Sequence, residues 1–303
     1  MNKILALFVV LVLMASCKGD NKVSILSQDL VDKYNQDPTP ITGNELIKEI
    51  LNKTKSVSDK VKLNDLLQYG YEISKDQNIT SRQAAFLFPL IKESAGSPDY
   101  ANKIFELAGL MKKMKKESAA NTLFMSIKDN HAGFGEMAKV KAMIGDTLPS
   151  VDNYILSLGE KLFIDVDNTG INRNAAMDYV DACEAFALGY PDSPQTAENL
   201  FKSAEVSKSI RTFGKSLSLY DWILERYPNY EKAPTAMFLK AFIIENNMKD
   251  DAKAKEIYNQ FIKTYPNHDL ADDVEFLLEN IGKTDEEILK MIEDKRKDKA
   301  PSE

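Results

Sequence analysis

Apolar residues recur at helical spacing along most of the chain. In the second half, one apolar stripe advances in steps of 4, 3, 4 and 3 residues, which places it on one buried face of a helix. The stripe consists of Phe213, Leu217, Tyr220, Leu224 and Tyr227. A helix at about 197–206 precedes it, and the same pairing recurs around a polar turn at 246–250. The pattern predicts antiparallel helical hairpins.

A short motif separates these hairpins and occurs three times, as Tyr190-Pro191-Asp192, Tyr227-Pro228-Asn229 and Tyr265-Pro266-Asn267. The prolines are 37 and 38 residues apart, and each is followed ten residues later by a phenylalanine, Phe201, Phe238 or Phe276. Proline lacks an N–H and forces the preceding residue out of helical dihedral angles, so it ends the second helix of each hairpin. A period of this length predicts an array whose units bury their apolar faces against their neighbours.

The motif resembles the tetratricopeptide repeat, in the long-period variety of bacterial outer-membrane assembly lipoproteins of the BamD kind and of the Tol-Pal-associated periplasmic coordinator. The segments YPDSPQTAENLF and YPNYEKAPTAMF carry the resemblance, and Ala254, Tyr258 and Pro266 stand at the family's small, aromatic and proline positions. The sequence departs at Ser216, where the family has alanine, and in the acidic third copy YPNHDLADDVEF, which is expected to face solvent. The resemblance covers about 190–280 and implies an all-α array of antiparallel helical hairpins, a right-handed solenoid.

The N-terminal half is expected to form degenerate hairpins of the same kind. Thr42 with Glu45, and Thr80 with Gln83, have capping-box spacing and predict two helix starts. Pro89 lies within the second of these helices and is expected to kink or break it. The other predicted helical segments of this half lie at about 60–75, 98–128, 134–144, 151–163 and 173–188.

The N-terminus has the pattern of a secretory signal. Lys3 precedes an apolar run from Ile4 to Ala15, which is too short for a lasting transmembrane helix. Ser16-Cys17 follows, and the whole stretch resembles a bacterial lipoprotein signal, which implies lipidation of the Cys17 thiol. Two or three acyl chains suffice for stable anchoring. Lys18 directly after the cysteine favours the outer membrane. The lysine-then-acid start also resembles surface-export signals, so both sides of that membrane stay open, with the periplasmic side preferred.

These patterns predict five segments along the chain. They are a signal peptide at 1–16, a lipid anchor and flexible tether at 17–41, degenerate helical hairpins at 42–170, tetratricopeptide-like repeats at 171–282, and a C-terminal capping helix with a frayed tail at 283–303. The last helix is expected to begin at a capping box of Thr284 and Glu287.

Composition and charge agree with a helical repeat protein and limit its partners. With 13 glycines and 11 prolines in 303 residues, the chain has too few for a low-complexity or β-rich protein. A formal net charge of −7 argues against a nucleic-acid partner, because phosphate binding needs a clustered basic surface. The one dense basic run is expected to end a helix at its negative pole, and it consists of Lys112, Lys113, Lys115 and Lys116.

No pattern of catalytic or metal-binding residues stands out in the sequence. Asp165–Gly170 begins like a calcium loop, but its twelfth position is Ala176 in place of a bidentate glutamate, so a turn between helices is expected. The two histidines, His131 and His268, form no ligand cluster with cysteines, and the sequence has no glycine-rich phosphate loop or nucleophile elbow. We therefore expect no cofactor, no metal and no enzymatic activity.

Two further residues are candidates for particular roles. With Cys17 lipidated, Cys183 has no partner for an intramolecular disulfide, and we expect it to be buried as a small hydrophobe. Trp222 lies two residues past Tyr220, about 200° around the helix from the apolar stripe. It therefore either packs against the next hairpin or is exposed, and an exposed tryptophan is a natural anchor for a partner.

The resemblance implies a lipid-anchored scaffold that binds other proteins in the cell envelope. Its implied partner is a protein. The first hypothesis is that the chain is an accessory subunit of a β-barrel assembly machine of the outer membrane. Envelope coordination of the Tol-Pal or cell-division type is the alternative within binding proteins. A surface lipoprotein that captures a nutrient or polymer is the alternative from another class, as is an enzyme in the degenerate half.

Overall fold

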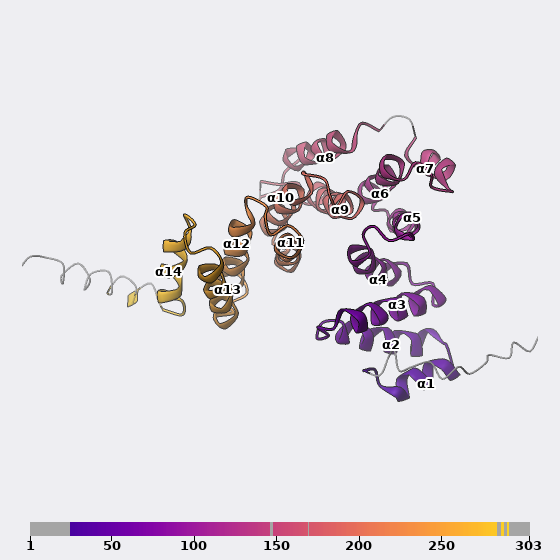
Figure 1. Cartoon of the computed structure of the whole chain (residues 1–303), viewed down its shortest axis with the longest axis horizontal. Helices are drawn as coiled ribbons and strands as arrows, with labels where there is room; N and C mark the ends of the chain where they lie inside the picture. Colours follow the sequence, from indigo (N-terminus) through magenta and orange to yellow (C-terminus); the bar gives the residue numbers. More distant parts are fainter. Residues whose placement is uncertain (1–24, 146–147, 169, 284–285, 288–289, 291–303) are drawn as a thin grey trace, which may run out of the picture. The chain divides into compact units, whose positions relative to one another are not determined.

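The computed structural model describes residues 25–145, 148–168, 170–283, 286–287 and 290. In this part of the chain every regular element is a helix, with fourteen α-helices, one 3-10 helix and no strand. The predicted all-α fold is therefore confirmed. The chain divides into two compact units, Met1–Leu90 and Ile91–Glu303, and Figure 1 gives the order of their helices.

The first unit holds the N-terminal helices, α1 (Gln28–Gln36), α2 (Pro40–Lys53), α3 (Lys60–Asp76) and α4 (Thr80–Glu93), apart from the last three residues of α4. Helix α1 contacts α2, and α2 contacts α3. Gly43 of α2 allows this approach, because a Cβ there would lie 2.9 Å from Gln77 and 3.3 Å from the Tyr34 ring. Gln77 also donates a hydrogen bond from Nε2 to the Tyr34 hydroxyl at 3.4 Å. The buried Tyr34 thus joins three helices.

Helix α1 lies inside the segment 17–41 that the sequence predicts to be a flexible tether, so this part of the prediction is wrong. Leu26 and Tyr34 are buried, with 7% and 6% of their surface exposed. Burial of these two side chains against the neighbouring helices offsets the entropy lost when the segment becomes ordered.

Helix α2 begins at Pro40, two residues before the predicted cap at Thr42. Thr39 is the true N-cap: its hydroxyl accepts from Thr42 N at 3.4 Å, and Thr42 Oγ1 accepts from Thr39 N at 3.1 Å. Proline is favoured at the first helical position because its missing N–H would be unpaired there in any case. Glu45, predicted to complete a capping box with Thr42, instead forms an ion pair with Lys33 of α1 at 2.7 Å.

Helices α3 and α4 pair closely, as the first of the predicted degenerate hairpins. A Cβ on Gly70 would lie 2.5 Å from the Phe86 ring, so only glycine permits this approach. Gln83 donates from Nε2 to the Ser74 carbonyl at 3.1 Å, which places it between the helices and not in the predicted capping box with Thr80. Helix α4 continues through Pro89 to Glu93, so the predicted break is absent.

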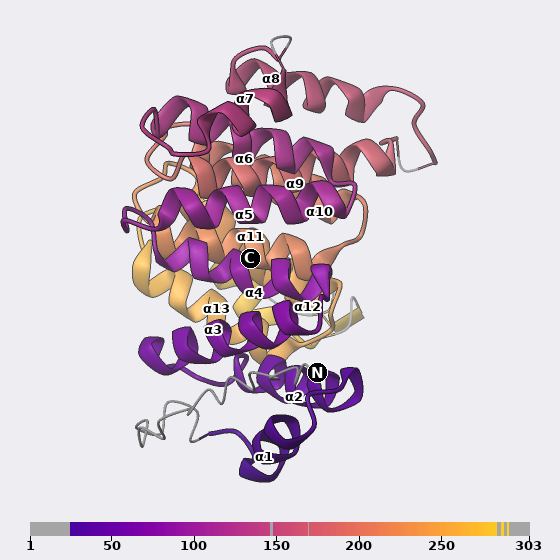
Figure 2. The same cartoon turned by 90° about the vertical axis from the view of Figure 1, so that its right-hand side faces the viewer.

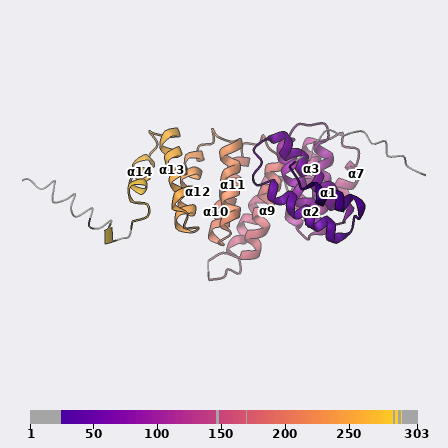
Figure 3. The ribbon, with the colours of Figure 1, turned by 90° about the horizontal axis from the view of Figure 1, so that it is seen from below.

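The second unit is a series of helices that pack mainly against their chain neighbours. Its hairpins are formed by α5 (Tyr100–Lys113), α6 (Glu117–Asn130), α9 (Arg173–Gly189), α10 (Thr196–Ser209), α11 (Phe213–Arg226), α12 (Ala233–Asn246), α13 (Asp251–Thr264) and α14 (Ala271–Asn280). Consecutive helices from α9 to α14 are in contact, and Figure 3 shows α11 to α14 in a row. This is the predicted solenoid of antiparallel hairpins.

One backbone turn joins each hairpin to the next helix. If the last residue of the hairpin is residue i, then residue i+3 donates its N–H to the carbonyl of residue i. Residue i+6 in turn donates its N–H to the carbonyl of residue i+3. This pair of bonds recurs at Ser94, His131, Tyr190, Tyr227 and Tyr265. The intervals are 37, 59, 37 and 38 residues, so the repeat begins well before the Tyr-Pro motifs, and one unit is 22 residues longer than its 37-residue neighbours.

The turn inside each hairpin is also shared. One residue there adopts a left-handed conformation: Asn78, Lys115, Arg211 and Lys249 have φ between 52° and 61°. In the turns after α3, α5 and α10, the next residue donates its N–H to a carbonyl five places earlier, as in a Schellman motif. Non-glycine residues rarely adopt this conformation, so surrounding packing must hold it.

Most side chains at the repeat positions are buried. Two positions are unusual, one because it is exposed and one because it is polar. Phe201 is 5% exposed, whereas Phe276 in the last copy is 49% exposed, in agreement with the predicted solvent-facing cap. Ser216, where the family has alanine, is fully buried, and its hydroxyl donates to the Ala204 carbonyl at 2.8 Å. A small polar residue is tolerated there because its hydroxyl finds an acceptor.

The long interval lies between α6 and α9, which pack directly on each other (Figure 2). Lys116 at the start of α6 pairs with Asp181 at 2.7 Å, and Asn130 at its end donates to the Gly189 carbonyl at 3.0 Å. Both contacts advance in the same chain direction, so the two helices run parallel. A parallel pair cannot be joined by a short turn, which explains the extra residues.

The close contact of α6 and α9 gives a stability prediction. A Cβ on Gly189 would lie 2.4 Å from both Cβ and Oγ of Ser126, so Gly189→Ala should lower the free energy of unfolding by ~1–3 kcal/mol, as overpacking does. Gly109→Ala in α5 is the matched control, because no atom lies within 4 Å of its added Cβ. It should raise stability by ~0.5–1 kcal/mol. Urea unfolding measures both, and equal stability of the two variants would contradict the described packing.

Candidate functional site

The long interval places three additional elements beside the array. They are α7 (Met137–Ile144), α8 (Val151–Glu160) and the 3-10 helix η1 (Lys161–Phe163). Helix α7 contacts α6, and α8 contacts α9. The buried residues of α8 are Val151, Ile155 and Leu158, at the i, i+4, i+7 spacing of one helix face. Since α9 already packs on α6, α8 lies beside α9 and leaves a space between itself and α10.

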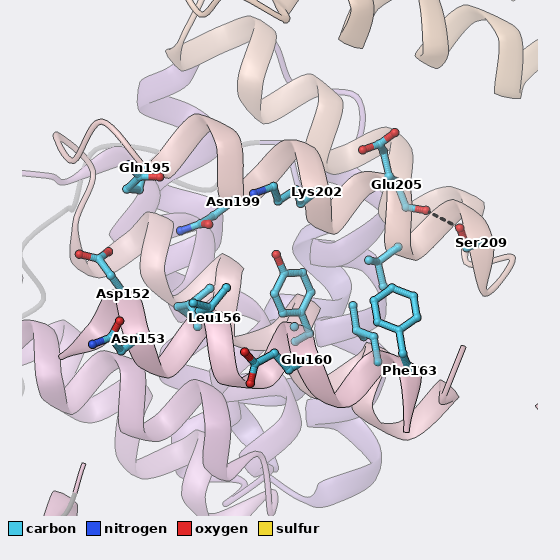
Figure 4. A pocket seen from close by; sticks show the side chains of 15 residues that line it. Asp152, Asn153, Leu156, Glu160, Phe163, Gln195, Asn199, Lys202, Glu205 and Ser209 are labelled. Atoms are coloured by element: carbon cyan, nitrogen blue, oxygen red, sulfur yellow. Dashed lines mark hydrogen bonds between the residues drawn. The ribbon is translucent and has the colours of Figure 1, made fainter. Parts of the chain in front are cut away.

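That space is a groove of about 790 Å³ with α8 and α10 as its walls and Tyr179 of α9 on its floor. Its lining residues are Asp152, Asn153, Ile155, Leu156, Gly159, Glu160, Leu162, Phe163, Tyr179, Gln195, Asn199, Lys202, Glu205, Val206 and Ser209. Figure 4 shows Asp152 and Gln195 at one end of this α8–α10 groove and Phe163 and Ser209 at the other.

The α8–α10 groove has an apolar floor and two exposed apolar side chains. Ile155, Leu162 and Tyr179 are buried beneath it. Leu156 and Phe163 are 62% and 71% exposed, although both belong to residue types that usually lie in cores. Single exposed hydrophobic residues are ordinary, but two beside one cavity form the kind of surface that partners cover.

Asn199 is the most unusual polar residue of the groove. It is only 9% exposed, and among the described residues its side-chain amide has no hydrogen-bond partner. Figure 4 shows this amide directed toward the groove. The amide atoms reach the surface of the groove, so their hydrogen-bonding capacity is open to a ligand. The donor and acceptor of the amide together match a peptide group.

The floor of the groove provides no nucleophile at neutral pH. Burial raises the pKa of the Tyr179 phenol above its ordinary value of 10.0, with a further rise from Cys183 beside it. Burial also raises the pKa of the Cys183 thiol to about 12, although hydrogen bonds from Ser203 and Tyr179 oppose the shift. Cys183 is fully buried, as predicted from the sequence. Both groups therefore stay protonated and serve packing.

An ion-pair network fixes the α10 wall from its far side. Glu198 accepts from Lys232 at 2.9 Å and from the Tyr230 hydroxyl, and Lys202 pairs with it at 3.2 Å. Lys202 lines the groove, so its charge is already engaged by Glu198. The Lys232 ammonium also lies 5.3 Å from the centre of the Phe201 ring, a cation–π contact.

Trp222 does not offer the exposed anchor that the sequence left open. The side chain is 5% exposed, with the Lys92 ammonium 5.0 Å from its ring centre. It lines a small cavity of about 180 Å³ together with Tyr100, Leu188 and Pro191. Trp222 is therefore buried, but against elements that precede α11 and not against the next hairpin, where the sequence placed it.

The other predicted sites give no metal or membrane element in the described part. Cys17 lies outside the described residues, as do most of the predicted C-terminal helix and tail. In the calcium-like stretch, Asn172 caps α9 by accepting from Asn174 and Ala175, as a turn between helices does. No group of three or more histidine, cysteine, aspartate or glutamate residues gathers there or elsewhere in the described residues. Within the same residues, no helix has the length and apolarity needed to cross a bilayer.

Comparison with known proteins identifies one repeat directly. Residues 235–268 match the sequence model of a family described as tetratricopeptide repeat, and this stretch covers most of α12, all of α13 and the junction at Tyr265. A search of curated proteins gave no match. The match and the all-helical fold show that the chain contains a tetratricopeptide repeat. Such repeats commonly mediate protein–protein contacts, which is consistent with a protein partner.

The sequence did not single out the groove residues Leu156, Phe163 and Asn199. One signal was available: the interval between His131 and Tyr190 is longer than the repeat period, although His131 lacks the proline that marks the other junctions. A second was the apolar run at Phe163 and Ile164 between polar residues. Neither signal predicts that α8 stands apart from α10.

Glu198 gives a prediction about acid stability. Burial alone raises the pKa of its carboxyl, but hydrogen bonds from Tyr230, Lys232 and Lys202 outweigh burial and hold the pKa at about 2, against an ordinary value of 4.5. Because the folded pKa is depressed, the stabilisation is fully present above the ordinary value and is lost as the pH falls toward about 2. Glu198→Gln should therefore be less stable than the parent at neutral pH.

That difference should shrink as the pH falls below the ordinary value, which urea unfolding at neutral and acidic pH measures. Glu275→Gln in α14 is the control, because the Glu275 side chain is exposed and has no ion pair among the described residues. A difference for Glu198→Gln that stays constant down to strongly acidic pH would contradict the network.

Proposed function

We propose that the α8–α10 groove binds a segment of another protein. The observation that carries this proposal is the amide of Asn199 at the wall of an apolar groove, which has no hydrogen-bond partner among the described residues. A peptide backbone offers that amide a donor and an acceptor, while Leu156 and Phe163 cover the side chains of the segment. Protein binding, the general role of tetratricopeptide scaffolds, is thereby assigned to this groove.

The dimensions of the groove agree with a short segment. Its α10 wall extends from Gln195 to Ser209. At a rise of ~1.5 Å per helical residue this wall is ~20 Å long, which accommodates about six residues of an extended chain or about four turns of a helix. A volume of about 790 Å³ falls within the usual range for ligand sites.

The proposed setting is the cell envelope. The apolar run before Cys17 supports export and lipidation, and the net charge of −7 supports a protein partner over nucleic acid. The chain is then a lipid-anchored scaffold at the outer membrane, accessory to the assembly of outer-membrane proteins, on the periplasmic side in preference to the surface. A Tol-Pal or cell-division partner would move it to envelope coordination, and a bound nutrient or glycan would make it a capture lipoprotein.

Site-specific photo-crosslinking in the native cell tests the groove. The crosslinking residue p-benzoylphenylalanine replaces Leu156 or Phe163 in separate variants, and Met248, which is 53% exposed in the turn before α13, in the control. The two groove positions should give the same protein adduct, and position 248 should not. Identical adducts from all three positions, or none from the groove, would reject this surface as the site.

A second variant tests the anchor independently. Cys17→Ala removes the proposed lipid acceptor, so the protein should move from the membrane fraction to the soluble fraction. Cys183→Ala is the matched control, since that thiol is buried in the fold and should not affect fractionation. Detergent partitioning and mass spectrometry of the N-terminal peptide provide the measurement. Membrane association that survives Cys17→Ala, with no lipid on the parent peptide, would sink the anchor.

A further inference from the structure

We propose that the segment bound in the α8–α10 groove is basic as well as apolar: its lysine or arginine side chains pair with Asp152 and Glu160 while its apolar side chains cover Leu156 and Phe163. This inference rests on the proposed function, because it names the partner chemistry of the same groove.

The charges of the groove are unequal. The carboxylates of Asp152 and Glu160 line it, against the single ammonium of Lys202. Lys202 already pairs with Glu198 at 3.2 Å, outside the lining. Glu205 also borders the groove, but Figure 4 shows its carboxylate directed away from α8. Among the described residues, neither Asp152 nor Glu160 has an ion pair. The groove therefore presents negative charge without internal compensation.

The carboxylates are also distributed along the groove. Asp152 and Glu160 stand on the α8 wall, eight residues apart. Figure 4 shows Asp152 toward one end and Glu160 in the middle. At a rise of ~1.5 Å per helical residue they are ~12 Å apart along α8, so a single small cation cannot meet both, whereas a segment that lies along the groove meets each in turn. This arrangement fits an elongated ligand with more than one positive charge.

The apolar part of the groove limits the class of possible ligands further. A purely basic segment would leave Leu156 and Phe163 exposed to water, and each of them holds a large apolar surface. An acidic segment would place like charges opposite Asp152 and Glu160, at a cost in binding free energy. A membrane surface with anionic lipids is repelled for the same reason. The remaining class is an amphipathic segment with apolar and cationic residues.

Peptide binding to the full chain, purified in detergent, tests this chemistry. Three fluorescent peptides of about twelve residues serve as probes: one alternates leucine and phenylalanine with lysine, the second has glutamate for every lysine, and the third has serine for every apolar residue. Fluorescence anisotropy should show the first binding about tenfold more tightly than either of the others. Higher ionic strength should weaken this binding, because the carboxylates are exposed to screening.

A charge-reversed pair of variants makes the test specific to the groove. Glu160→Lys should weaken the basic peptide by about tenfold, equivalent to ~1.4 kcal/mol, and should strengthen the acidic one. The control is Glu275→Lys, which makes the same change in net charge at an exposed position of α14. The control should change affinity less than twofold. Both substituted positions are exposed, so unchanged melting curves should accompany the result.

The outcomes separate this inference from the proposed function. If Phe163 crosslinks a partner but the crosslinked segment is acidic or neutral, the groove remains the binding site and the basic partner is wrong. Equal losses in the groove variant and the α14 control also overturn it, as does failure of every peptide to bind. A crosslink to residues 291–303 of a second copy would give the groove to this chain itself. Absence of any crosslink at Leu156 and Phe163 removes both proposals.

Discussion

The direct packing of α9 on α6 is the constraint on which the rest of the second unit depends. The two helices are in contact from the Lys116–Asp181 ion pair to Gly189, where α9 has no side chain and the Ser126 side chain of α6 packs against its backbone. Tyr190 extends the contact by donating its hydroxyl to Asp129 at 2.7 Å. With α6 on one side and α10 on the other, the last two turns of α9, Ala182 to Gly189, are buried. Even Glu184 is buried, where burial raises its pKa while the Lys215 ammonium at 2.8 Å opposes the rise.

This packing explains why a groove occurs at one place in the array. In the regular hairpins, each helix covers the apolar face of its neighbour, so little apolar surface remains. Helices α6 and α9 are parallel, so they do not form a regular hairpin, and α8 covers only part of α9. The exposed large apolar residues of the described chain concentrate in this interval and at its end, and five of them are Leu156, Phe163, Ile164, Val166 and Met177.

The regular part of the fold could be predicted because local rules determine it. Proline after Tyr227 and Tyr265 ends a helix whatever the tertiary surroundings, and the spacing of apolar residues fixes the buried face. The same turn forms at Ser94 and His131 without proline, so backbone hydrogen bonds alone are sufficient for it. These two junctions have no sequence signature, and the N-terminal half therefore looked degenerate although its turns are regular. Helix α1 was missed for a related reason, because burial of Tyr34 against two other helices stabilises it.

The candidate site could not be predicted because the groove forms where no element of the chain fills the space between α8 and α10. Apolar spacing in α8 predicts its buried face, Val151, Ile155 and Leu158, but contains no information about the distance to α10. That distance is set by α9, because α9 packs directly on α6 and α8 packs only beside α9. The polar side of the site also depends on a tertiary contact: Glu198 engages Lys202 from outside the groove, so the nearest cation is withdrawn from Asp152 and Glu160. Two separate tertiary contacts, one of packing and one of charge, thus leave the same surface both apolar and negative. A partner that supplies only one of the two complements would leave the other part unsatisfied, which is why the groove favours a segment that carries both.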